Sequence, residues 1–299
     1  MCLTLVGYRT NNPAREKDVM KKIAWVTDST STLDSAFAEQ NHIYIVPLRI
    51  VFGEECYRET EEISSDMFYA KLEASSRSSS SQPPIGEFIE LYESLQGEYD
   101  EIITIHCSTA LSGTLHTSMQ AAEIAGVKVT AIDSRAGAYP LREMIMQGLE
   151  WQKQGCSPSE IKANIEQMID NMSFYLIPAS LQNLHRSGRV TGTQLIISQL
   201  LKIHLLLRFE EGKVVVNEKI RTFRRTKERM LDMLKKDMEK VKHVCIMHAN
   251  NHEEAHTIKQ QITELLPRLK TEIMPFIPVV SIHAGAGTIG LCWIRSDKA

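Results

Sequence analysis

The stretch that decides the fold is Ile102–Thr114, IITIHCSTALSGT. It begins as an apolar, largely β-branched run and ends in serine, threonine and glycine, which is typical of a buried parallel strand that runs into a loop. Because Leu115–Ala125 is predicted to form a helix, Ser112, Gly113 and Thr114 lie between strand end and helix start. Open α/β sheets bind ligands at this place, where free N–H groups favour a negative charge.

Strand and helix patterns alternate around this stretch. Lys22–Asp28 and Val127–Asp133 are apolar strands that end in Asp-Ser, and His42–Phe52 gives strand material interrupted by Pro47. The Ser-rich run Ser75–Pro84 is predicted to be a loop. The predicted helices are Thr32–Gln40, Ser65–Ala74, Ile85–Gln96, Pro140–Gln154 and one that starts at the capping box Ser157–Glu160. This alternation is the βαβ signature of a parallel sheet.

The second half of the chain has a different pattern. Leu205–Glu210 and Lys213–Ile220 flank Glu211-Gly212, which predicts a β-hairpin. The other predicted strands are Val241–His248, Glu272–Ile277, Val279–His283 and Ile289–Ile294, and the predicted helices are Gln194–Lys202, Thr226–Glu239 and Glu253–Leu266. Hairpins mixed with helices predict a sheet that is partly antiparallel.

These patterns predict an α/β protein of two domains. Residues 22–172 form an N-terminal α/β domain with a parallel sheet, and residues 173–299 form a C-terminal α/β domain with a mixed, partly antiparallel sheet. A ligand is expected between the two. Residues 1–21 are expected to be a polar tail before the first strand, and Met20 is an alternative start of the chain.

Composition narrows the class of protein. The 299 residues are 43% hydrophobic and 24% charged, which is ordinary for a globular protein with ample material for a core. A net charge of -3 argues against nucleic-acid binding. The most apolar window, Leu200–Phe209, is too short and too charged to cross a membrane, so stable membrane insertion is not expected. The six scattered cysteines, without a CxxC motif, predict reduced thiols in the cytoplasm.

Hydroxyl groups and one histidine are the first candidate site. Ser80 and Ser81 end one serine run, and Ser112 and Thr114 flank Gly113 in the opening stretch. Uncharged hydroxyls donate as well as accept, so with backbone N–H groups they can hold a carboxylate or phosphate. His283 precedes a glycine-rich turn that lets backbone approach a ligand closely. The alternative is that these serines are solvated turns and caps and that the histidine is structural.

Two catalytic alternatives are weaker. His252-Glu253-Glu254-Ala255-His256 matches the HExxH pattern of zinc proteases, but its context favours an acidic first turn of a surface helix, and no metal or other cofactor is expected. Ser112 with His283 would make a serine esterase or thioesterase, although no GxSxG elbow is present.

Basic residues form the last candidate site. Arg186–Arg189 and Arg221–Arg225 are charge runs of the kind that is usually a solvated face. A partner that carries phosphate or acidic residues is the alternative, with Arg189 and Arg221 as the contact residues.

Taken together, the motifs resemble those of the DegV family of bacterial fatty-acid-binding proteins, from about Lys22 to Ile294. The first strand with its Asp-Ser-Thr end is similar to that of the family. The other matching segments are Ser80–Pro84, Ser108–Thr114 (Ser-x-x-Leu-Ser-Gly-Thr), Leu181–Arg189, Lys219–Thr222 and His283–Gly287. Three departures stand out: Ser80 replaces Thr, Ile203 stands where Pro is frequent, and Ala286 replaces Pro.

The resemblance implies one long-chain fatty acid between two domains. It places the carboxylate on Ser80, Ser112 and His283. It also implies a non-catalytic role, as the acyl-carrying subunit of a fatty acid kinase whose separate kinase subunit phosphorylates the bound carboxyl for phospholipid synthesis. The apolar tunnel for the acyl chain is expected to involve Leu195–Leu201 and Leu205–Leu207.

Overall fold

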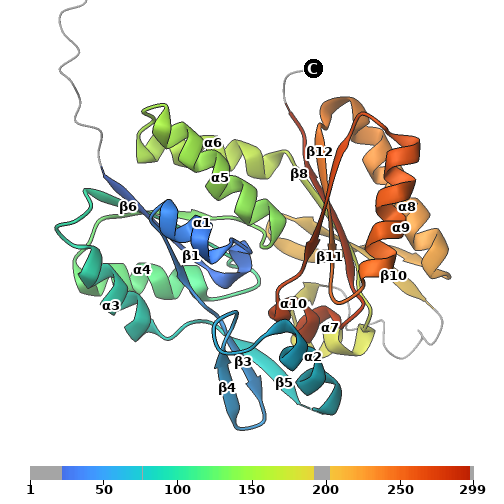
Figure 1. Ribbon diagram of the computed structural model, residues 1–299, viewed down its shortest axis with the longest axis horizontal. Coiled ribbons are helices and arrows are strands. Elements are labelled where there is room, and N and C mark those ends of the chain that lie inside the picture. Colours follow the sequence, from blue (N-terminus) through green and yellow to red (C-terminus); the bar gives the residue numbers. More distant parts are fainter. Residues whose placement is uncertain (1–21, 76, 192–202, 297–299) are drawn as a thin grey trace, which may run out of the picture.

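Three β-sheets organise the chain in the computed structural model, which describes residues 22–75, 77–191 and 203–296 (Figure 1). One sheet is parallel, one is small and antiparallel, and one is mixed. The predicted α/β class with a parallel and a mixed sheet in two domains is confirmed. The division at residues 172 and 173 stays a prediction, although the first strand of the mixed sheet begins there.

The parallel sheet has the strand order β2-β1-β6-β7. Its strands are β1 (Ile23–Asp28), β2 (Ile43–Val46), β6 (Glu101–His106) and β7 (Val129–Asp133). Every residue of β1 and β6 is buried because helices cover both faces of the sheet. One face carries α3 (Ile85–Leu95) and α4 (Thr114–Ala125), and the other carries α1 (Ser35–Gln40), α5 (Tyr139–Lys153) and α6 (Pro158–Asp170).

Two local expectations in this half are corrected. Pro47 splits the predicted strand His42–Phe52 into β2 and β3 (Arg49–Phe52), which join different sheets. The run Ser75–Pro84 is not all loop, because Ser78–Ser81 forms β5. The free edge of β3 pairs with this segment, and such pairing overrides the weak strand preference of serine. With β4 (Glu55–Arg58), these strands form the small sheet β4-β3-β5, next to α2 (Ser65–Ala74).

The mixed sheet has the order β13-β12-β14-β8-β10-β11-β9. Its strands are β8 (Met172–Ile177), β9 (Val190–Thr191), β10 (His204–Glu210), β11 (Lys213–Ile220), β12 (His243–His248), β13 (Lys270–Pro275) and β14 (Ile289–Ile294). The predicted hairpin is confirmed, and Glu211 and Gly212 both take the positive φ that its turn requires. Helices α8 (Phe223–Asp237) and α9 (His252–Leu265) pack on one face, and α7 (Leu181–Ser187) lies by the other (Figure 1).

The predicted strand Val279–His283 is wrong, because Pro278–Ala284 forms the helix α10. Pro278 occupies its first turn, where the missing N–H costs nothing. Its β-branched residues favour a strand locally, but neighbouring elements surround the segment. Figure 1 shows α10 beside α7, α2 and β5. The predicted helix Gln194–Lys202 lies outside the described residues.

The close packing of α5 against the parallel sheet can be tested at Gly148. A Cβ atom there would lie 2.3 Å from Cη2 of Trp25, which is buried and held by a 2.7 Å hydrogen bond to Gln152. We expect Gly148→Ala to destabilise the protein by roughly 1–3 kcal/mol, because overpacking outweighs the better helix propensity of alanine. Urea unfolding measures this.

Gly86 is the matched control for that substitution. It lies in α3, and a methyl group added at this position would meet nothing within 4 Å. Gly86→Ala should therefore leave stability unchanged or raise it by up to ~1 kcal/mol. Equal stabilities of the two variants would contradict the packing argument.

Two properties of the described residues bear on membrane insertion and on the zinc-site alternative. None of the helices in the described ranges combines the length and the apolar surface needed to cross a membrane. Among the same residues, no three His, Cys, Asp or Glu side chains converge on a position where they could hold a metal ion. His252 begins α9, and its ring lies tilted against that of His248, with centroids 4.1 Å apart.

Candidate functional site

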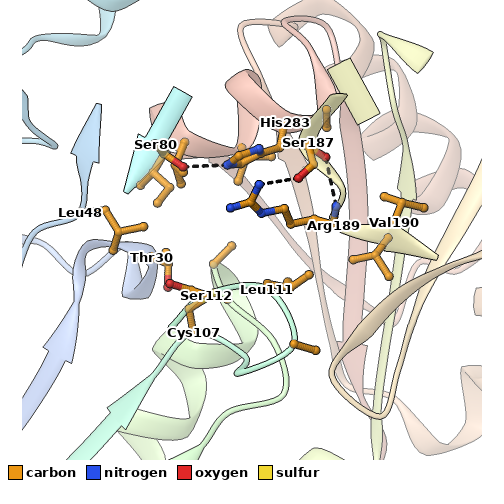
Figure 2. A pocket seen from close by; sticks show the side chains of 18 of the residues that line it. Thr30, Leu48, Ser80, Cys107, Leu111, Ser112, Ser187, Arg189, Val190 and His283 are labelled. Atoms are coloured by element: carbon orange, nitrogen blue, oxygen red, sulfur yellow. Dashed lines mark hydrogen bonds between the residues drawn. The ribbon is translucent and has the colours of Figure 1, made fainter. Parts of the chain in front are cut away.

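A cavity of about 560 Å³ lies where the three sheets meet, and Figure 2 shows it at close range. The first half of the chain contributes Thr30, Leu48, Ser80, Ser81, Gln82, Cys107, Thr109, Ala110, Leu111, Ser112, Gly113, Gly137 and Ala138. The second half contributes Phe174, Leu176, Leu184, Ser187, Arg189, Val190, Leu207, Phe209, Val214, Phe276, Ile277, Val279, Val280, His283 and Ala284. The volume is in the range of sites that enclose small organic molecules.

The mixed sheet supplies an apolar wall. Phe174 and Phe209 stack with ring centroids 4.4 Å apart, beside aliphatic side chains of β8, β10 and β11. Of the predicted tunnel segment Leu205–Leu207, Leu207 lines the cavity, whereas Leu206 points into the core under α8 and α9. The other predicted segment, Leu195–Leu201, lies outside the described residues. The cavity therefore offers a mainly apolar surface to a ligand.

Ser80 and His283 form a polar corner of the cavity. Ser80 on β5 and His283 on α10 share a 2.8 Å hydrogen bond between Oγ and Nε2 (Figure 2). Burial, together with the positive charge of Arg189, lowers the pKa of His283 to about 4. The imidazole is therefore neutral at neutral pH, so one ring nitrogen carries a hydrogen and can donate it.

The opening stretch supplies a second polar part of the wall. Ser112 and Gly113 line the cavity, and Ser81 lines it from β5. The Ser112 and Thr114 hydroxyls are 2.7 Å apart, while Thr114 is itself fully buried outside the lining. Gly113 lies so close to Gln82 that a Cβ atom would come within 2.1 Å of Oε1. A glycine here allows the two segments to meet.

The turn that carries Ser112 is anchored on both sides. The Ser108 N–H donates to Ala136 O at 2.8 Å, and the Ser108 hydroxyl donates to Gly212 O in the β10–β11 turn at 2.7 Å. The N–H of Ser112 then donates back to Ser108 O at 2.9 Å. The hydroxyl of Ser112 is thus presented from a fixed backbone.

A buried carboxylate joins the carboxyl ends of β1 and β6. Asp28 accepts hydrogen bonds from the N–H groups of Thr30 and Cys107, both at 2.9 Å, and lies 3.0 Å from His106 Nδ1. Burial acts to raise the pKa of Asp28, but the hydrogen bonds and the charge of His106 outweigh it, so the pKa falls below its usual value. Since Thr30 and Cys107 line the cavity, these hydrogen bonds fix the position of this part of its lining.

The two arginines singled out from the sequence lie in different places. Arg189 lines the cavity near His283, and its guanidinium donates to the carbonyl of Ser187 (Figure 2). Arg221 is exposed in the turn between β11 and α8 and is not part of the lining. Only Arg189 is thus in a position to affect a ligand directly.

The pairing of the histidine bears on the esterase alternative. The hydrogen bond of His283 goes to Ser80, whereas the hydroxyl of Ser112 pairs with Thr114. The hydrogen bond between Ser112 and His283 that the esterase alternative requires is therefore not among those of the described residues. Sequence reasoning also passed over Thr30, Leu48 and Cys107 as lining residues. Thr30 follows β1 at the same sheet edge as the opening stretch, which was a usable signal.

Comparison with known proteins gives consistent matches over almost the whole chain. Residues 22–296 match the family model described as "Uncharacterised protein, DegV family". A DegV domain-containing protein of Halalkalibacterium halodurans is 33% identical over 279 residues, which cover 92% of this chain and 99% of that protein. Protein DegV of Bacillus subtilis is 34% identical over 276 residues, with 91% and 98% covered.

Solved structures agree with these matches. The crystal structure of DegV from Bacillus subtilis, a fatty acid binding protein, superposes with a TM-score of 0.84 at 33% identity and covers 92% of this chain and 100% of that one. A DegV family protein from Thermus thermophilus, described for its fatty acid binding, gives 0.83 at 26% identity, with 92% and 99% covered. On this evidence from sequence and structure, the chain belongs to the DegV family.

Proposed function

We propose that the protein binds one long-chain fatty acid in the cavity, with the carboxylate at Ser80, Ser112 and His283. The observation that carries the proposal is a mainly apolar cavity with a few convergent neutral donors. The relatives from Bacillus subtilis and Thermus thermophilus, both described as binding fatty acid, support it. The polar part of the lining also includes Ser81 and Gly113. The hydroxyl of Thr114 orients that of Ser112 through their hydrogen bond.

The physical chemistry of the cavity suits such a ligand. Burial of a methylene gives about 0.8 kcal/mol, so ~15 methylenes give on the order of 10 kcal/mol before the costs of binding. The carboxylate must then be held by donors, because an unpaired buried charge is very costly. Hydroxyls and a neutral imidazole supply those donors, and the guanidinium of Arg189, which lines the cavity near His283, adds a positive charge beside them.

We further propose that the protein is not itself an enzyme and presents the bound acid, in the cytoplasm, to a fatty acid kinase subunit that forms the acyl phosphate for phospholipid synthesis. Arg189 at the cavity and the exposed Arg221 are the proposed contacts with that subunit. The test is acyl phosphate formation from the loaded protein, ATP and a bacterial fatty acid kinase subunit. Arg221→Glu should reduce the rate without lowering fatty-acid affinity.

Bound lipid is the direct test of the binding proposal. Native mass spectrometry of the protein purified from a bacterial host should show a mass increase that corresponds to one fatty acid, which denaturation releases. A ligand-free protein that also fails to take up added palmitate or oleate would refute the proposal. Hydrolysis of an ester or acyl-CoA that depends on Ser112 would favour the esterase alternative instead.

Ser112→Ala is expected to weaken fatty-acid binding by roughly 3- to 10-fold. It removes one hydroxyl donor, while the Gly113 N–H and the Thr114 hydroxyl stay in place beside it. Titration with a fluorescent fatty acid measures the change. Ser94→Ala, which alters an exposed hydroxyl on α3, is the control and should bind normally. Equal affinity of the two variants would move the carboxylate away from Ser112.

A further inference from the structure

Glu59 is a buried carboxyl group that takes no part in the contacts proposed above. It follows β4 in the small sheet, and its side chain is fully buried. Burial of a carboxylate is costly, whereas a leucine of similar size would be buried without cost. The contacts of Glu59 are therefore informative about what this position does.

The two carboxylate oxygens of Glu59 bind two distant parts of the chain. Oε2 accepts a 2.6 Å hydrogen bond from the hydroxyl of Ser29, and Oε1 accepts a 2.7 Å hydrogen bond from the backbone N–H of Val279. The Ser29 hydroxyl in turn accepts from the N–H of Leu48 at 3.1 Å. Since Leu48 and Val279 both line the cavity, Glu59 lies directly behind its wall.

The contact with Val279 bears on His283 because both residues are on α10. They are four positions apart, so they lie on the same face of the helix. A helix of seven residues does not hold its own position, which is set by the elements around it. The Glu59 carboxylate holds the backbone of its first turn. Further along, Tyr69 and Ser281 share a 2.9 Å hydrogen bond between their hydroxyls.

We propose that Glu59 is a positioning residue for the carboxylate site: its carboxyl holds α10 against the small sheet and so keeps His283 within hydrogen-bonding distance of Ser80. The proposal rests on the proposed function, because it assigns Glu59 to the same head-group site. Ser80 comes from β5 of the small sheet and His283 from α10, so any shift between these two elements separates the donors. Glu59 itself does not touch the ligand.

The test uses NMR spectroscopy of bound palmitate that is labelled with 13C at its carboxyl carbon. The chemical shift of this carbon reports the surroundings of the carboxylate, and a competition titration gives the affinity. The variants are Glu59→Leu, which removes both acceptors, and Glu59→Gln, which keeps Oε1 for the Val279 N–H. Glu54→Gln is the matched control, because Glu54 is an exposed glutamate in the nearby β3–β4 turn.

The expected results separate the proposals. We expect the control and Glu59→Gln to bind within about threefold of the wild type, whereas Glu59→Leu loses at least tenfold and its bound carboxyl resonance moves. A wild type that binds no palmitate would contradict the proposed function. A wild type that binds, together with a folded Glu59→Leu variant of unchanged affinity and resonance, would overturn the positioning role alone.

If Glu59→Leu does not fold, the positioning role of Glu59 is tested by recording the bound carboxyl resonance at a series of pH values. Burial, opposed by the hydrogen bonds from Ser29 and Val279, raises the pKa of Glu59 to about 7. The bound carboxyl resonance of the wild type should therefore change through pH 7, and that step should be absent in Glu59→Gln. The other titratable or charged groups around α10 and Glu59 are retained in both proteins: Asp28, Tyr69, Arg189 and His283. A step of equal size in Glu59→Gln would overturn the proposal.

Discussion

His283→Ala is expected to weaken fatty-acid binding by roughly 10- to 100-fold, which corresponds to the loss of one hydrogen bond to a charged group, about 1.5–3 kcal/mol. The imidazole is buried at the polar corner and neutral at neutral pH, because its pKa is lowered to about 4. Its removal leaves the carboxylate with fewer donors and leaves Ser80 without its 2.8 Å partner. Competition titration against a fluorescent fatty acid measures the affinity.

His116→Ala is the control for this prediction. His116 is an exposed histidine of α4 outside the cavity lining, so its loss should leave affinity unchanged. His283→Asn adds a second comparison, because an amide N–H restores a donor on a shorter side chain and should recover part of the affinity. Wild-type affinity in His283→Ala would place the carboxylate elsewhere in the cavity.

Glu59→Gln is expected to change the pH dependence of stability by roughly 3 kcal/mol. The pKa of Glu59 rises from 4.5 to about 7 on folding, and this difference of about 2.5 units corresponds to about 3 kcal/mol at 1.36 kcal/mol per unit. Since the folded protein then binds more protons than the unfolded chain, Glu59 contributes stability that is fully present below pH 4.5. That contribution is lost as the pH rises to about 7.

Urea unfolding at a series of pH values measures this change. The free energy of unfolding of Glu59→Gln, relative to that of the wild type, should increase between pH 4.5 and 7 and then level off. Glu54→Gln, at an exposed position, should show a flat difference. A flat difference for Glu59→Gln as well would mean that the Glu59 carboxyl titrates normally in the folded protein.

Local patterns were sufficient for most of the fold. The helices α2 and α6 and the β10–β11 hairpin lie where capping residues, apolar spacing and the Glu211-Gly212 turn predict them. Local patterns gave the wrong conformation for β5 and α10, because the conformations of these two elements depend on partners far along the chain. The polar corner of the candidate site is built from these two elements. Sequence motifs therefore named Ser80 and His283 but did not predict the elements that carry them.

The sequence by itself determined the parallel sheet, the mixed sheet and the hydroxyl-rich turn Ile102–Thr114, because periodicity and turn chemistry act over a few neighbouring residues. Only the tertiary structure decided the pairings that make the site. Ser80 meets His283 across 203 positions, and Glu59 meets Val279 across 220. Such contacts leave no local pattern, since they depend on how separate elements pack and which donors their burial leaves facing the cavity.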